Sequence, residues 1–172
     1  FIQQWVIGVA EASLEEMIRT KNFNTGFHWI PVPSKEKLEA DPFILDTGEG
    51  GFDILFEDYS LSDACGKIVV MSLDKQFRVI NKKLLLDTGS HLSYPFIYRE
   101  AGKIFVFPES ASAGSLCCYE YDPVKKEFIF LKEVIKEPLL DSTIIFHQNK
   151  YWLFATRKGS WSDQQLHLYS AD

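Results

Sequence analysis

The chain has 172 residues, enough for one domain with a sizeable core, and its 46% hydrophobic and 15% aromatic content excludes a disordered or low-complexity protein. A net charge of −6 argues against nucleic acid or an anionic membrane as the partner, because both attract basic surfaces. No apolar run approaches the ~20 residues that span a bilayer, and no signal-peptide pattern is present. The sequence starts at Phe1 and stops within a strand-like pattern, so we interpret it as a piece of a longer protein.

The first 33 residues predict a lead-in of mixed structure. Residues 3–11 have the pattern of a strand, and residues 13–21 that of a short helix, with Ser13 as N-cap and Glu16 three residues later as in a capping box. Residues 27–33 are extended, and their prolines disfavour a central strand.

Residues 34–172 contain a repeat. Strand-sized runs of Ile, Val, Phe, Tyr and Trp alternate with turn residues in three units. The units span residues 40–87, 93–136 and 140–172. A period of roughly 40–50 residues with four strands is typical of a β-propeller blade. The third unit lacks its outermost strand, and an early strand could close the ring against the last blade.

The three cysteines, Cys65, Cys117 and Cys118, form no CxxC motif and have no histidine at zinc-site spacing, so no metal is expected. They are interpreted as free thiols, which favours a reducing, cytoplasmic location. The glycine-rich segment 46–53 lies between two strands and predicts a hairpin turn rather than a phosphate-binding loop. No cofactor is therefore expected.

Several motifs together resemble a known group of propellers. They are ADPF in the first unit, HLSYPF and PES in the second, and DST followed by a Trp-containing strand in the third. The chain resembles the five-bladed propeller of glycoside hydrolase family 43, most closely the propeller-like domain of glucosamine inositolphosphorylceramide transferases and related bacterial proteins. The resemblance implies an all-β fold, a partial five-bladed β-propeller of about three blades with a short N-terminal helix.

Three acidic residues are the candidate catalytic groups. Asp41 and Asp141 occupy the same column of the repeat, Tyr94 fills it in the second unit, and Glu109 ends the next strand of that unit. The resemblance implies that Asp41 is the general base and Asp141 the residue that orients the site. It also implies a glutamate as acid, and Glu109 is the candidate. We expect the three carboxylates on one face, within roughly 12 Å of one another.

Two other interpretations of these acids remain open at this point. The aspartates could form turns or tie neighbouring blades together, or the acids could line a pocket without catalysis. The candidate substrate-binding residues are Asp58, His91, Tyr94, Arg157 and Trp161. Asp58 is aligned with Glu109 in the repeat. Trp161 lies in a polar loop, where its ring suits stacking on a sugar.

The leading functional prediction is a carbohydrate-binding or glycoside-processing domain, with a glycosidase using the Asp/Asp/Glu constellation as its active form. The alternative is a non-catalytic substrate-positioning or structural module attached to a glycosyl- or formyltransferase-like domain. The expected partner is a carbohydrate or glycoconjugate. Self-association through open blade edges is also predicted, because exposed apolar edges favour association.

Overall fold

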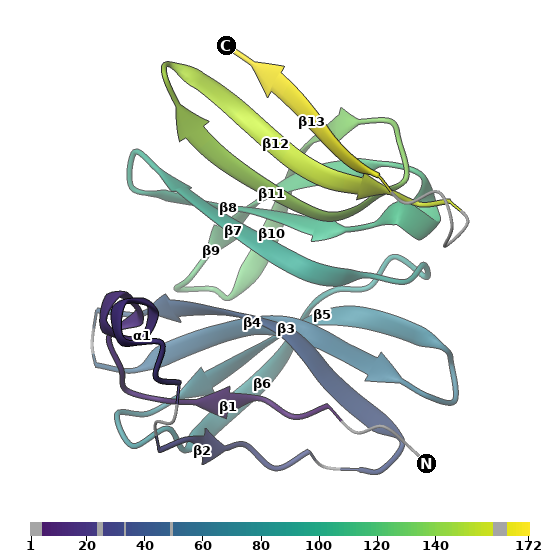
Figure 1. Cartoon of the computed structure of the whole chain (residues 1–172). Coiled ribbons are helices and arrows are strands. Elements are labelled where there is room, and N and C mark those ends of the chain that lie inside the picture. The colour runs from purple at the N-terminus through teal and green to yellow at the C-terminus, as the bar shows by residue number, and fades with distance from the viewer. Residues whose placement is uncertain (1–4, 24–25, 33, 49, 160–164) are drawn as a thin grey trace.

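The computed structural model describes residues 5–23, 26–32, 34–48, 50–159 and 165–172, and it consists mainly of three antiparallel sheets stacked as successive blades (Figure 1). Within each sheet the strands follow chain order. The first blade contains β3 (Lys37–Asp46), β4 (Phe52–Ser60), β5 (Cys65–Leu73) and β6 (Val79–Leu86). The second contains β7 (Ser93–Glu100), β8 (Lys103–Glu109), β9 (Leu116–Asp122) and β10 (Glu127–Ile135). The third contains β11 (Leu139–His147), β12 (Lys150–Arg157) and β13 (Leu166–Ala171).

These sheets confirm the all-β propeller fold, with two blades of four strands and a third of three among the described residues. A single turn of 3₁₀ helix, Ala111–Ala113, joins β8 to β9. The described part of the chain contains no helix with the length and apolar composition that crossing a bilayer requires. Cys118 is buried, Cys65 and Cys117 are half-buried, and all three thiols are free.

The N-terminal segment lies against the first blade. It forms β1 (Gly8–Val9), α1 (Leu14–Thr20) and β2 (His28–Trp29), and β1 pairs with β2. The expected N-cap is confirmed, because the Ser13 hydroxyl accepts the Glu16 backbone N–H at 3.2 Å. Figure 1 places β1 and β2 beside the first blade and far from the third, so closure of a ring by these strands remains a prediction.

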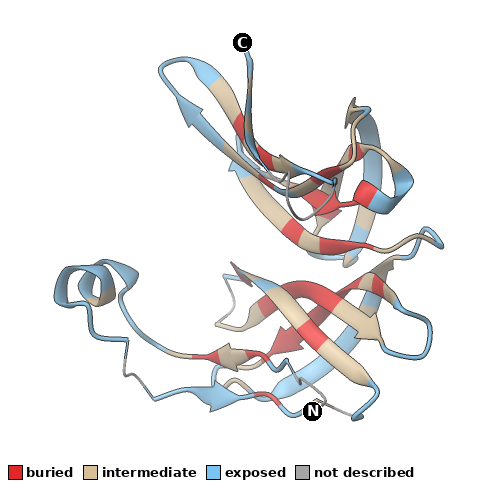
Figure 2. Ribbon diagram, turned by 45° about the vertical axis from the view of Figure 1, so that its right-hand side comes forward, coloured by how far each residue is buried: buried red, intermediate tan, exposed pale blue. Residues whose placement is uncertain are grey.

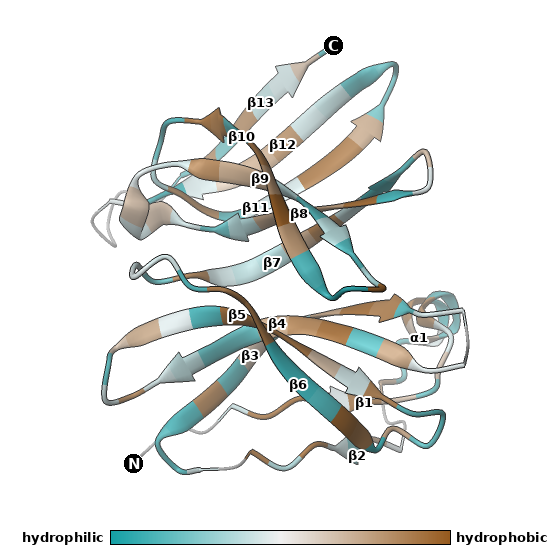
Figure 3. Cartoon of the chain, turned by 180° about the vertical axis from the view of Figure 1, so that it is seen from behind, coloured by the Kyte–Doolittle hydropathy of each residue, from teal (hydrophilic) through white to brown (hydrophobic). Residues whose placement is uncertain are grey.

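The core is layered between the blades, as the buried bands in Figure 2 show. One cluster joins the N-terminal segment to the first blade, one joins the first and second blades, and one joins the second and third. Their central buried side chains include Ile30 and Phe56, then Leu55 and Val106, then Leu116 and Leu139. Each such side chain contributes about 2 kcal/mol through removal from water. In Figure 3 the hydrophobic colour of the first blade concentrates on its two central strands, β4 and β5, whereas the middle of the outermost strand, β6, is hydrophilic.

A buried polar network also joins the first two blades. Asp53 on β4 is only 1% exposed, and its Oδ1 accepts hydrogen bonds from the Ser72 hydroxyl at 2.8 Å and the Lys126 ammonium at 2.6 Å. Its Oδ2 accepts the Tyr121 hydroxyl at 3.0 Å. Both carboxylate oxygens are thus satisfied, and donors from the second blade reach into the first. This network fixes the relative position of two of the three blades that contribute to the site described next.

The third blade leaves apolar side chains exposed. Leu166 and Leu168 on β13 are 73% and 55% exposed, whereas Leu153 on β12 is packed into the core. Self-association through this blade therefore remains a prediction.

Candidate functional site

The first strand of every blade carries the same backbone irregularity. Asp41, Tyr94 and Asp141 have φ angles of 51°, 39° and 51°, and each lies at a register shift where two residues oppose one. Non-glycine residues with positive φ are uncommon, so a threefold occurrence marks a defined feature of the blade. The expected alignment of these three positions is confirmed. The bulge sets the direction of each side chain at the end of its blade.

On the second strand of each blade, one residue pairs with the residue directly before the bulge. Glu57 pairs with Ala40, Glu109 with Ser93, and Thr156 with Leu140. Glu57, rather than Asp58, is therefore the counterpart of Glu109, and the sequence alignment of Asp58 is wrong by one residue.

The difference of one position matters because neighbouring residues of a strand point to opposite faces of the sheet. Asp58 therefore lies on the opposite face from Glu57, and its carboxylate accepts a hydrogen bond from the Lys37 ammonium at 2.6 Å. In the sheet Phe56 occupies the position of Pro108, the residue before Glu109.

Glu57 fits into a space that Gly66 leaves free. A Cβ atom on Gly66 would lie 2.4 Å from Glu57 Oε1 and 2.5 Å from the Leu92 carbonyl oxygen. The Gly66 N–H donates to His91 Nδ1 at 2.9 Å, which leaves the ring proton on Nε2, 3.7 Å from Glu57 Oε1. The structure thus brings the candidate His91 beside Glu57, a residue that sequence reasoning missed.

Four carboxyl groups from three blades interact electrostatically at this end of the molecule. Burial, and to a smaller extent the negative charges of Asp41, Glu109 and Asp141, together raise the pKa of Glu57 to about 8. Burial also raises the pKa of Glu109 to about 7. The pKa of Asp141 is raised by burial and by Asp41, although a hydrogen bond with Glu109 opposes the shift. Near neutral pH, Glu57 and much of Glu109 therefore hold their protons.

Two of the four carboxylates are tied to the backbone of the next blade. Asp41 Oδ2 accepts the Tyr94 N–H at 3.2 Å, and Glu109 Oε2 accepts the Asp141 N–H at 3.3 Å. Each acid therefore spans from one blade to the bulge of the following one. These hydrogen bonds tie neighbouring blades together, and they also hold the two carboxylates in place at the site.

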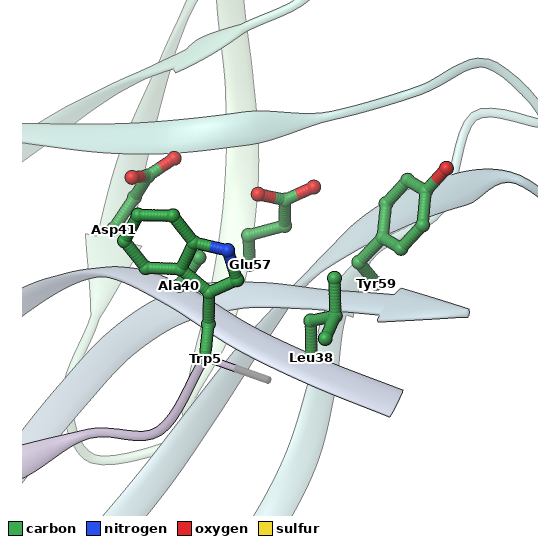
Figure 4. Close-up of a pocket in the computed structure, with 6 residues that line it drawn as sticks. All are labelled: Trp5, Leu38, Ala40, Asp41, Glu57 and Tyr59. Carbon is green, nitrogen blue, oxygen red and sulfur yellow. The ribbon is translucent and has the colours of Figure 1, made fainter. Parts of the chain in front are cut away.

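A pocket of about 260 Å³ opens beside the acids (Figure 4). It is lined by Trp5, Leu38, Ala40, Asp41, Glu57 and Tyr59. Trp5 comes from the N-terminal segment and is 53% exposed, so its ring is available to a ligand. Sequence reasoning treated Trp5 only as part of a strand and missed it, because only the tertiary fold brings residue 5 beside residue 57.

The remaining candidates are distributed as follows. The Tyr94 hydroxyl hydrogen-bonds Thr143 Oγ1 at 2.9 Å, and its ring packs edge-on against Phe43, so this side chain joins three blades. Arg157 lies at the end of β12 with its Nε 3.6 Å from a Glu137 carboxylate oxygen. Trp161 lies outside the described residues. In the described ranges, no group of three or more histidine, cysteine or acidic side chains could hold a metal ion.

Comparisons with known proteins agree with this architecture. The model of the family described as "Glucosamine inositolphosphorylceramide transferase 1, N-terminal" matches residues 31–171. The Arabidopsis thaliana protein of that name is 33% identical over 134 residues, which are 76% of this chain and 17% of the relative. The chain thus spans less than a fifth of the length of this curated relative.

Among solved structures, an exo-β-1,3-galactanase from Phanerochaete chrysosporium matches with a TM-score of 0.65 at 13% identity, over 86% of this chain and 38% of the other. RS223-β-xylosidase matches with a TM-score of 0.57 at 14% identity, over 85% of this chain and 58% of the other. At these identities the likeness concerns the fold, and the expected similarity to five-bladed family 43 propellers is confirmed.

Proposed function

Because this chain belongs to the family of N-terminal domains of glucosamine inositolphosphorylceramide transferase 1, we propose that it binds the sugar part of a glycoconjugate at the end of its blades. The observation that carries this proposal is the convergence of Asp41, Glu57, Glu109 and Asp141 beside a pocket with aromatic walls. Carboxyl groups hydrogen-bond sugar hydroxyls, and the faces of Trp5 and Tyr59 suit the apolar face of a sugar ring.

The hydrogen bonds of the acids favour binding over hydrolysis. Asp41 and Glu109 each use a carboxylate oxygen to accept a backbone N–H from the next blade. Such groups are held rigidly, and rigid polar groups provide orientation and selectivity at low entropic cost. In this proposal the acids orient a bound sugar, and the blades supply the frame.

Glycoside hydrolysis is the second candidate, and one observation favours it. Hydrolysis needs one protonated and one ionised carboxyl group near the scissile bond. The pKa of about 7 places Glu109 close to the operating range of a general acid, and Asp41 lies in the same cluster. In this second candidate Asp41 acts as the base and Asp141 orients the acid.

The relatives suggest a use for a binding domain. The similar plant proteins are named as transferases, and this chain corresponds to less than a fifth of the length of such a protein. We propose that the domain positions the sugar of a glycoconjugate for a transferase domain elsewhere in the parent protein.

A paired binding and hydrolysis experiment tests these proposals. The chain would be titrated with glucose, galactose, inositol and glucosamine by ligand-observed NMR, and incubated in parallel with 4-nitrophenyl glycosides. We expect binding that is weakened about tenfold by Trp5→Ala, the usual scale of one aromatic contact, and no nitrophenol release. Nitrophenol release that disappears in Asp41→Asn would establish the hydrolase instead. The Asn side chain retains an acceptor for the Tyr94 N–H, so the loss would reflect the missing carboxylate rather than a broken contact between blades. Absence of binding to every sugar would refute the proposed function.

A further inference from the structure

His91 is held beside Glu57 by the backbone of Gly66. The Gly66 N–H donates to His91 Nδ1 at 2.9 Å, and the Gly66 carbonyl oxygen accepts the Leu92 N–H at 2.9 Å. The segment before β7 is therefore tied at two points to the start of β5. Because Nδ1 accepts a hydrogen bond, it carries no proton, and the neutral ring keeps its proton on Nε2.

The protonated nitrogen of this ring faces the Glu57 carboxyl group. His91 Nε2 lies 3.7 Å from Glu57 Oε1, and the His91 ring stands edge-on to Tyr59 with centroids 5.8 Å apart. A distance of 3.7 Å is longer than a hydrogen bond, and polar contacts in unliganded sites often shorten only when a ligand binds. The approach depends on Gly66, since a Cβ atom at that position would collide with the same oxygen, Oε1.

The surroundings of Glu57 keep its carboxyl group protonated and the neighbouring histidine neutral. Three acidic side chains from three blades act on it electrostatically, namely Asp41 on β3, Glu109 on β8 and Asp141 on β11. Burial, and to a smaller extent these charges, raise the pKa of Glu57 to about 8. Burial and the charge of Lys158 lower the pKa of His91, although Asp41 opposes the shift. At pH 7 a neutral imidazole N–H therefore faces a carboxyl group that is mostly protonated.

This arrangement confines the proton of Glu57 to one of its two oxygens. An N–H group and an O–H group that point at each other repel, so Oε1, which faces the imidazole N–H, is the acceptor and the proton lies on Oε2. Glu57 lines the pocket together with Trp5 and Tyr59, and in Figure 4 its carboxyl group lies on the same side of the strands as that of Asp41. The O–H group on Oε2 is therefore what Glu57 offers to a ligand in this pocket.

We infer that His91 is a positioning residue for Glu57, and that it makes this carboxyl group a hydrogen-bond donor to a sugar oxygen without a hydrogen of its own, the ring oxygen or a glycosidic oxygen. This inference rests on the proposed sugar-binding function and adds the roles of two residues to it. On binding, the His91 Nε2–H closes on Oε1 while the Oε2–H donates to the sugar. An ionised Glu57 would place a negative oxygen against the lone pairs of the sugar, so binding requires the proton.

The first part of the experiment needs no ligand. Nitrogen NMR of the isotope-labelled 172-residue chain reports which ring nitrogen of His91 holds the proton. The side-chain carboxyl ¹³C signal of Glu57, assigned by its loss in Glu57→Gln, reports its ionisation. We expect a proton on Nε2 at pH 7, and a shift of the His91 nitrogen signals at the Glu57 midpoint near pH 8 that is missing in Glu57→Gln. A proton on Nδ1, or nitrogen signals that do not respond to the ionisation of Glu57, would overturn the inference.

The second part measures the affinity for D-glucose and D-galactose by NMR titration between pH 6 and pH 9. Binding is linked to one proton, so the affinity should fall about tenfold for each pH unit above pH 8. Glu57→Gln has no such proton, and its profile should lack this fall while keeping the contribution of Glu109. Glu133→Gln, a change at an exposed position of β10, should keep the fall. An affinity that stays constant or rises above pH 8 would overturn the donor role.

Two substitutions of His91 separate its contact with Glu57 from its contact with Gly66. His91→Gln places an amide nitrogen near the position of Nε2 and keeps a donor to Glu57, whereas His91→Asn places an oxygen near the position of Nδ1 and keeps only the contact with Gly66. We expect His91→Asn to weaken sugar binding at pH 7 about 2- to 10-fold, the range for one neutral hydrogen bond, and His91→Gln to restore most of it. The reverse order, in variants that circular dichroism shows to be folded, would overturn the positioning role.

The inference and the proposed function fail in different ways. Sugar binding with the wrong pH dependence overturns the donor role of Glu57 and leaves the proposed function intact. If neither sugar binds and the other sugars of the preceding experiment also fail, the proposed function is refuted, and donation to a sugar with it. The nitrogen spectra then still decide whether His91 positions Glu57.

Discussion

Replacing Glu57 with glutamine should stabilise the protein at alkaline pH and change it little at pH 5. The pKa of this carboxyl group is raised from 4.5 to about 8 in the folded protein, so the folded state holds a proton that the unfolded state has already lost. Its stabilising contribution is therefore fully present below pH 4.5 and is lost as the pH rises through 8. Glutamine has no proton to lose, and the variant should escape this loss.

The size of the effect follows from the pKa difference. Each pKa unit corresponds to 1.36 kcal/mol, so the shift from 4.5 to about 8 sets an upper limit of about 5 kcal/mol on the change in the free energy of unfolding above pH 8, and solvent screening at the pocket makes the change smaller. At pH 5 only about 1 kcal/mol has been lost. Glu109, whose pKa is raised to about 7, contributes a separate decline that Glu57→Gln leaves in place.

Urea unfolding followed by circular dichroism at pH 5, 7 and 9 measures the difference. The free energies of unfolding of the variant and the unmodified protein should diverge steadily between pH 5 and 9, with the variant the more stable. Glu133→Gln serves as the matched control and should follow the unmodified protein. Parallel pH profiles for Glu57→Gln and the unmodified protein would refute the claim that burial raises the pKa of Glu57.

Three further predictions concern the frame around the site. Asp53→Ala should reduce the free energy of unfolding by about 3–5 kcal/mol in urea titrations, because it leaves the Lys126 ammonium and the Tyr121 hydroxyl without their buried partner; a loss below 1 kcal/mol would contradict this role. Gly66→Ala should lower the free energy of unfolding by about 1–3 kcal/mol through overpacking, and it should displace the Glu57 carboxyl group. A pH titration of the ¹³C signal of that carboxyl group would show the displacement as a shifted midpoint, and an unchanged midpoint argues against the contact. Light scattering across a concentration series should show self-association through the exposed apolar side chains of the third blade, and a monomer at every concentration would exclude it.

The repeat in the sequence was sufficient to predict the fold and part of the site. Strand-sized apolar runs at a regular spacing predicted successive antiparallel blades, and the recurrence of Asp41 as Asp141 predicted equivalent positions. Those positions are repeated because each blade must make the same turn at its inner strand, and local sequence encodes that turn. The helix cap at Ser13 was predictable for a similar reason, since a cap depends on residues three positions apart.

The identity of the fourth acid depended on tertiary structure. Glu57 and Asp58 are adjacent, and a one-residue change of register moves a carboxyl group from one face of a sheet to the other. The hydrogen-bonded pairing with β3 places Glu57, rather than Asp58, at the position equivalent to Glu109.

The sequence by itself determined what depends on neighbours along the chain: the strand pattern, the repeat, the helix cap and the supply of acidic residues. The tertiary structure alone decided what depends on contacts between distant residues. It placed Trp5 beside Glu57 and brought the charges of three blades together. Burial and electrostatic interactions are properties of positions in space, so the pKa values that define this site arise only when the blades are stacked.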